Sequence, residues 1–138
     1  MIQTGKNSTE IESWIKLINA DRVGPAAFFK LLKHFKTPDN ALNASVAQLS
    51  KIDGIGTATA EKILRSKDNF NVRKELDLAR KLGINIIKFT DPAYPAPLKR
   101  IPDPPPLLYI KGQLKKDDNL AVAIVGSRRC SLYGKEQA

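Results

Sequence analysis

Ile52-Asp53-Gly54-Ile55-Gly56 is the stretch that sets the architecture of the first half of this chain. Gly54 and Gly56 permit a tight turn with a positive φ angle. They also leave backbone N–H groups uncovered at the start of the next helix, where unpaired donors and the helix dipole favour an anion. Ile55 is expected to plug the turn into the core. The stretch therefore predicts two helices joined by a hairpin that fits one phosphate group.

These glycines, followed by Ala60, Lys62 and Ile63, have the helix-hairpin-helix pattern. Lys62 adds a positive charge along the same phosphate path. Contacts of this kind follow the nucleic-acid backbone and not the bases, so they carry little sequence specificity. A tight helix connection that binds nothing is the alternative interpretation. The hairpin residues predicted to contact DNA are Gly54, Ile55, Gly56 and Lys62.

An earlier segment is a looser copy of this hairpin, Asp21-Arg22-Val23-Gly24-Pro25. Val23-Gly24 stands 32 residues before Ile55-Gly56. Arg22 takes the place of the first glycine, and Pro25 lacks one N–H donor. Paired copies of the motif pack as a single five-helix unit, so this segment predicts a tandem in which the second hairpin is the better phosphate site.

Apolar residues recur at helical spacing around both hairpins. Capping boxes are predicted for Thr9 with Glu12 and for Ser45 with Gln48. Helices are predicted over 10–19, from Gly24-Pro25, from Thr37-Pro38, from Gly56 or Thr57, and over 71–82, the last ending at Gly83. The sequence therefore predicts an all-α, SAM-like helix-hairpin-helix domain over 8–83, preceded by a disordered lead at 1–7.

The second half has the composition of an α/β protein. Short β-branched or apolar runs at 84–89, 107–112 and 120–126 are typical of strands, and the last is apolar enough for a buried strand of a parallel sheet. Between the first two lies DPAYPAPLKRIPDPPP, which holds seven of the nine prolines. A linker is the alternative interpretation, but the apolar residues Tyr94, Leu98 and Ile101 lead us to expect a segment that wraps a folded surface. We expect an α+β chain whose residues 84–138 begin a Rossmann-like domain that is truncated here.

A second phosphate-binding candidate follows the strand at 120–126. Gly126 lets an anion approach the backbone, the hydroxyl of Ser127 donates, and guanidinium groups grip phosphate bidentately. The loop is neither a dinucleotide fingerprint nor a Walker loop, and a surface loop with solvated arginines is the alternative. Its predicted binding residues are Gly126, Ser127, Arg128, Arg129 and Ser131.

Composition narrows the class of partner. The chain has 23 basic and 14 acidic residues, a net charge of +9 that suits a polyanion such as nucleic acid. No apolar run is long enough for a membrane span, no signal peptide is recognisable, and a single cysteine fits a reducing cytoplasm. We find no catalytic triad, paired carboxylates, metal-ligand spacing or cofactor motif, and expect binding without chemistry.

The sequence resembles the DNA-processing protein A (DprA/Smf) family of bacteria. The pattern that carries the resemblance is Tyr94-Pro95-x-x-Leu98-x-x-Ile101-x-Asp103-Pro104-Pro105-x-x-Leu108-Tyr109-x-x-Gly112, then Ile124-Val125-Gly126-Ser127-Arg128-Arg129-x-Ser131-x-Tyr133-Gly134. The resemblance implies a single-stranded-DNA-binding mediator of natural transformation and DNA recombination, which protects incoming DNA and helps load a RecA-type recombinase. It also implies that Gly126–Arg129 belong to a DNA pocket, and that the full-length protein forms a homodimer.

Two other functions fit the same residues. The helical domain over 10–82 can be a protein-interaction module, which a large exposed apolar patch would favour. The loop at Gly126 can instead belong to a nucleotide-processing, Rossmann-like enzyme whose acidic catalytic residues lie further along the chain.

Overall fold

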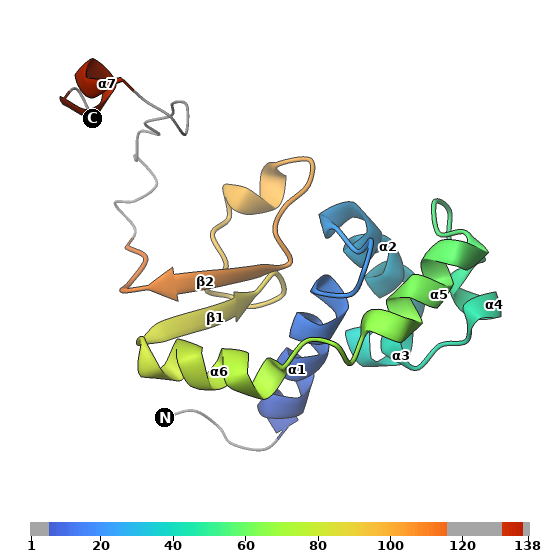
Figure 1. Ribbon diagram of the computed structural model, residues 1–138. Coiled ribbons are helices and arrows are strands. Elements are labelled where there is room, and N and C mark those ends of the chain that lie inside the picture. Colours follow the sequence, from blue (N-terminus) through green and yellow to red (C-terminus); the bar gives the residue numbers. More distant parts are fainter. Residues whose placement is uncertain (1–5, 116–130, 137–138) are drawn as a thin grey trace.

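The computed structural model describes residues 6–115 and 131–136, and within them an α+β fold (Figure 1). Six helices precede a two-stranded antiparallel sheet, and a short helix follows. The helices before the sheet are α1 Lys6–Ile18, α2 Pro25–Phe35, α3 Pro38–Leu42, α4 Val46–Leu49, α5 Thr57–Ser66 and α6 Val72–Lys81. The remaining elements are β1 Ile84–Lys88, the 3-10 helix η1 Leu98–Arg100, β2 Leu107–Lys111 and α7 Leu132–Glu136.

Local sequence signals account for most helix boundaries. The capping box of Ser45 and Gln48 is confirmed, with both reciprocal hydrogen bonds present at the start of α4. Thr37 caps α3 by accepting from the Asn40 N–H at 3.1 Å. Gly83, at φ 65°, follows α6 in the left-handed conformation that ends helices.

The predicted start of the first helix is wrong. The helix begins at Lys6, so Thr9 lies within it and does not cap it. The Thr9 carbonyl instead accepts a bond from the Ser13 hydroxyl at 3.2 Å, one turn further along. The polar residues before the first apolar position therefore continue the helix toward the N-terminus. Apolar periodicity could not show where the helix begins, because it gives no signal within a polar run.

One hydrophobic core lies under the helices and reaches the sheet. Trp14 and Phe28 occupy its centre, with ring centroids 5.0 Å apart. Leu107 of β2 belongs to the same cluster, and Ile86 and Phe89 pack against it. The helical and β parts of residues 6–115 therefore share their packing. The other large side chains that are fully buried are Ile15, Leu17, Leu31, Leu49 and Ile63.

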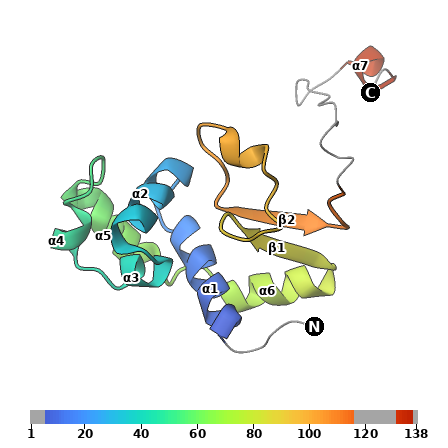
Figure 2. The same cartoon turned by 180° about the vertical axis from the view of Figure 1, so that it is seen from behind.

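The sheet lies between α6 and the proline-rich segment. β1 pairs with β2 in the register Ile86 opposite Tyr109, and the Phe89 N–H continues the ladder to the Pro106 carbonyl at 2.9 Å. Both views place α6 on one side of the two strands and η1 on the other (Figures 1 and 2). The strand predicted over 120–126 lies outside the described residues.

Residues 90–106, called the strap below, wrap a folded surface as one of the two interpretations predicts. Tyr94 is 3% exposed, and its hydroxyl donates to the Pro105 carbonyl at 2.8 Å. Its ring packs on Phe89, which packs on Phe29 of α2. The ammonium group of Lys99 lies 5.2 Å from the Phe89 ring centroid. Ile101, in contrast, is 42% exposed and does not anchor the strap.

An ion pair joins the first helix to the sheet. Lys88 Nζ lies 2.8 Å from Glu10 of α1 and 3.6 Å from Asp91 of the strap, and its side chain is only 15% exposed. An ion pair that is only partly shielded from water adds little to the free energy of folding, and its main effect is to fix how α1 lies against the sheet.

No helix among the described residues is long and apolar enough to cross a bilayer.

Tyr94→Phe tests whether the strap is held by its hydrogen bond. Burial raises the pKa of Tyr94, so the hydroxyl stays protonated and donates. Its removal leaves the Pro105 carbonyl without this partner and should lower the free energy of unfolding by about 1 kcal/mol. Urea denaturation measures the change. Tyr133→Phe, at a tyrosine that is 71% exposed, is the control; equal stability of the two variants would contradict the assignment.

Candidate nucleic-acid interface

The second hairpin has the geometry that its glycines predict. The Ile55 N–H donates to the Ile52 carbonyl at 2.9 Å, and Gly54 between them has φ 82°. Ile55 is 3% exposed, so its side chain does plug the turn into the core. Gly56 precedes α5 in an extended conformation and supplies no side-chain cap. The first N–H groups of α5 therefore face outward without a capping side chain.

The first hairpin repeats this geometry closely. The Val23 N–H donates to the Ala20 carbonyl at 3.1 Å, and the Phe28 N–H donates to the Gly24 carbonyl at 2.9 Å. The second copy has the matching bond from the Ala60 N–H to Gly56, also 2.9 Å. Arg22 adopts φ 66° at the position where the other copy has Gly54. The two hairpins are therefore more alike in backbone geometry than in sequence.

The two hairpins differ in what surrounds them. The first lines a cleft of about 510 Å³ that also includes the strap residues Pro105 and Pro106 and the side chain of Glu75. Burial, together with Glu75, raises the pKa of Tyr109 in this cleft to about 12. Pro25 removes one N–H at the start of α2. A nearby carboxylate and a missing donor make this end of α2 a poor anion site.

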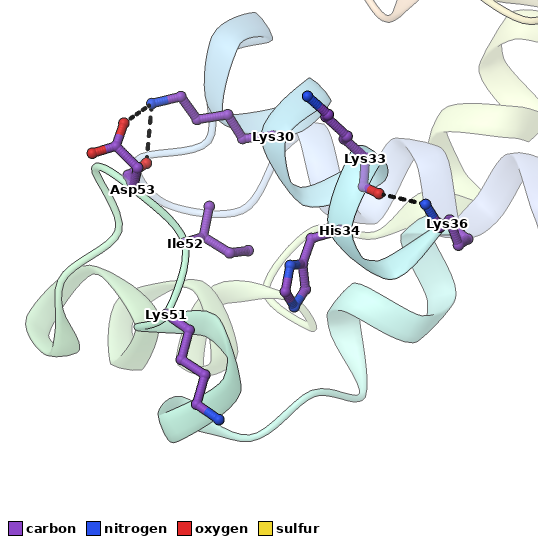
Figure 3. A pocket seen from close by; sticks show the side chains of 7 residues that line it. All are labelled: Lys30, Lys33, His34, Lys36, Lys51, Ile52 and Asp53. Carbon is purple, nitrogen blue, oxygen red and sulfur yellow. Dashed lines mark hydrogen bonds and ion pairs between the residues drawn. The ribbon is translucent and has the colours of Figure 1, made fainter.

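The second hairpin borders a basic pocket of about 480 Å³ (Figure 3). Four lysines contribute to its lining against one aspartate, and they come from α2, its C-terminal end and the turn before the hairpin. The exposed ring of His34 also lines the pocket and packs edge-on against Phe35. We use the name basic pocket for Lys30, Lys33, His34, Lys36, Lys51, Ile52 and Asp53.

Lys30 connects the two copies at this pocket. Its ammonium group bonds to the Asp53 carboxylate at 2.8 Å and to the Asp53 carbonyl at 3.0 Å (Figure 3). The hydrogen bond and the charge of Lys30 hold the pKa of Asp53 below its usual value. Asp53 thus remains an anion and partly neutralises Lys30. The Lys36 ammonium group donates to the Lys33 carbonyl at 3.0 Å, which leaves Lys33 and Lys51 as the cations more available to a ligand (Figure 3).

The structure brings together only some of the residues predicted to bind phosphate. Gly54, Ile55 and Gly56 form the hairpin beside the basic pocket, whereas Lys62 is exposed on α5 and does not line it. Ser131 is exposed just before α7. Gly126, Ser127, Arg128 and Arg129 lie outside the described residues, so their loop stays a prediction.

The pocket lysines were missed by sequence reasoning, although one signal was present. Lys30 stands 32 residues before Lys62, the same offset that relates the two hairpins. The repeat therefore marks equivalent lysines, yet only the structure shows that Lys30 reaches the hairpin of the other copy. Lys33 likewise stands 32 residues before a basic residue, Arg65. Lys36 and Lys51 have no comparable signal, because the equivalent positions hold Asp68 and Asn19.

Comparisons with known proteins agree with this architecture. Residues 15–66 match the SAM-like helix-hairpin-helix tandem, the class of domain that the two hairpins define. Residues 85–138 match the DNA recombination-mediator protein A family. The chain belongs to this family, as the resemblance predicts.

Individual relatives point the same way. Protein Smf of Synechocystis is 31% identical over 131 residues, which cover 92% of this chain and 33% of the relative. DNA processing protein DprA of Bacillus subtilis is 34% identical over 110 residues, covering 77% of this chain and 36% of the relative. The chain thus spans about a third of the length of these relatives. A DNA ligase of Coprothermobacter proteolyticus is 37% identical over 65 residues, covering 47% of this chain and 10% of the ligase.

Gly54→Val tests the turn that shapes the interface. A β-branched residue at φ 82° is strained, and its Cβ would lie 3.4 Å from Lys30 Nζ. The variant should lower the free energy of unfolding by roughly 1–2 kcal/mol, measured by thermal or urea denaturation. Gly56→Val is the matched control, because Gly56 has ordinary extended backbone and open space at its Cβ. Equal stability of the two variants would contradict the role of the positive φ.

Proposed function

We propose that this chain is part of a single-stranded-DNA-binding recombination mediator that acts in the cytoplasm, and that its second hairpin holds the DNA backbone. One observation carries the proposal: the uncapped start of α5 follows a positive-φ turn that borders a pocket with four lysines. Membership of a family of DNA recombination mediators supports the choice of DNA as the anion.

The geometry suits phosphate and not bases. Outward-facing N–H groups at the start of α5, together with the helix dipole, complement one phosphate oxygen. The lysines of the basic pocket then neutralise neighbouring phosphates along the strand. The described pocket has no aromatic side chain other than His34, so base stacking contributes little there. Binding at this hairpin should depend strongly on salt and weakly on sequence.

A second DNA contact is proposed at the loop over 126–129, with Ser131 beside it. The resemblance to the DNA-processing protein A family supports this choice, as do the two guanidinium groups after Gly126. In this proposal the loop contributes more to the affinity for DNA than the hairpin does, and the hairpin contacts a further part of the same strand. Loading of a RecA-type recombinase, a role in natural transformation and a homodimer of the full-length protein belong to the same proposal.

The mediator is proposed to act by binding and not by chemistry. Within 6–115 and 131–136, no group of three or more His, Cys, Asp or Glu side chains gathers to hold a metal ion. The acidic residues near the hairpin are exposed, and Asp53 is engaged with Lys30. To protect a DNA strand and pass it on, a mediator must bind the strand backbone and later release it. Reversible contacts to phosphates can do both without a chemical reaction.

Neutralising Lys33 and Lys51 tests the hairpin. The double variant Lys33→Gln, Lys51→Gln should weaken binding of a short single strand to this chain roughly tenfold at low salt. The slope of log K against log salt should decrease by about 1.4, since each phosphate contact to a single strand contributes about 0.7. Fluorescence anisotropy with a labelled strand, and with a matched duplex, measures both quantities.

The control is a pair of lysines at the other end of the molecule. Lys74→Gln, Lys81→Gln makes the same change in net charge on α6, far from the hairpin, and should leave the affinity nearly unchanged. If both double variants lose affinity equally, binding reports net charge alone, and the hairpin is not the site.

The loop at 126–129 is tested in the full-length protein. Arg128→Ala with Arg129→Ala should weaken single-strand binding more than Lys62→Ala does, because bidentate guanidinium contacts exceed one exposed ammonium group. The same anisotropy titration compares the variants. Unchanged affinity in the double arginine variant would remove the loop from the proposal and leave the hairpin as the candidate.

A further inference from the structure

Two exposed leucines lie beside the buried face of α6. Leu78 and Leu82 stand one turn apart and are 49% and 48% exposed. The inner face of the same helix is occupied, because Val72 and Ala79 are buried. The apolar face of α6 is therefore wider than the part that the fold buries within the described residues.

Positive charge surrounds one of these leucines. A shallow groove of about 790 Å³ is lined by Leu78 together with Arg73, Lys74, Arg80 and Lys81. Its acidic member, Asp77, is engaged by Arg80 at 2.9 Å. The groove thus offers four cations around an exposed leucine.

The groove is remote from the proposed DNA contact. α6 lies at one end of the described fold and the helices α4 and α5, which flank the second hairpin, lie at the other, in both views (Figures 1 and 2). A strand seated at the hairpin does not by itself cover α6.

We infer that the α6 groove binds an acidic protein segment, which places one apolar side chain on Leu78 in the groove and a second on Leu82 just beyond it, between flanking carboxylates. Charge complementarity selects an acidic partner, since four cations line the groove and only Arg80 is paired with its acidic member Asp77. The leucines select a protein over a nucleic-acid backbone, because phosphates gain nothing from half-exposed apolar side chains, whereas a peptide buries them. Arginine beside apolar surface is also typical of protein interfaces.

Selection from a displayed library of random peptides, with the whole chain as bait, tests this inference. The expected result is enrichment of sequences that combine Asp or Glu with two apolar residues. The most enriched peptide is then synthesised with a fluorescent label and titrated by anisotropy. Two peptide controls accompany it, one with the apolar residues changed to Ser and one with the acids changed to Asn or Gln, and both should bind at least tenfold more weakly.

Variants of the chain locate the site. Lys74→Gln with Lys81→Gln, and separately Leu78→Ser, should each weaken the selected peptide about tenfold, a loss typical of a contact at the centre of an interface. Both changes fall on exposed side chains, and circular dichroism checks that the fold is kept. Lys33→Gln with Lys51→Gln is the matched control and should leave the peptide affinity unchanged while weakening DNA.

Several results would overturn the inference. They are the absence of any enriched acidic-apolar sequence, peptide binding that survives the α6 variants, and displacement of the peptide by a single-stranded oligonucleotide in the Lys33, Lys51 variant. A concentration-dependent dimer that the α6 variants abolish would assign the groove to a second copy of the chain instead. Because the two double variants affect different ligands, this inference and the DNA proposal fail separately.

Discussion

The helical half of this molecule depends on one tight turn of the backbone. The turn is closed by a single backbone hydrogen bond and contains a residue at a positive φ. It occurs after Ala20 and again after Ile52. Because the closing residue is apolar and buried, Val23 or Ile55 locks the turn onto the core. The same turn ends in an extended glycine and directs the first N–H groups of the next helix outward. Packing and exposed backbone donors thus arise from one local geometry.

The sequence predicts the parts of this fold that depend on neighbouring residues. Glycine, proline and capping signals locate the starts of α2 to α5 and the end of α6, because each acts through backbone geometry within a few positions. The start of α1 and the positive φ of Arg22 were not predictable, since helix-compatible polar residues and tertiary packing override the local preference. The basic pocket was missed for a related reason: its lysines lie apart in sequence, and only the packing of α2 on the second hairpin gathers them.

An unbroken series of aromatic contacts joins the helical half to the strap. Trp14 packs on Phe28, Phe28 on Phe29, Phe29 on Phe89 and Phe89 on Tyr94, with centroid distances between 4.8 and 5.8 Å. The Tyr94 hydroxyl then donates to the Pro105 carbonyl, two residues before β2 begins. The Tyr94-Pro95 to Gly112 pattern that carries the family resemblance is accordingly structural in its described part. It holds the strands against the helices.

The two turns are nearly identical in backbone geometry but differ in the charges around them, and this difference decides which of them suits an anion. The backbone of both can present N–H groups to an anion, so the turn alone does not distinguish them. What differs is electrostatic: Pro25 and Glu75 accompany the first, whereas Lys33, Lys36 and Lys51 accompany the second. Even Asp53, at the tip of the second hairpin, has its charge offset by Lys30 from the first copy. The first copy thus contributes a cation to the second and keeps its own hairpin against the strap, so the two hairpins form one asymmetric unit and are not equivalent.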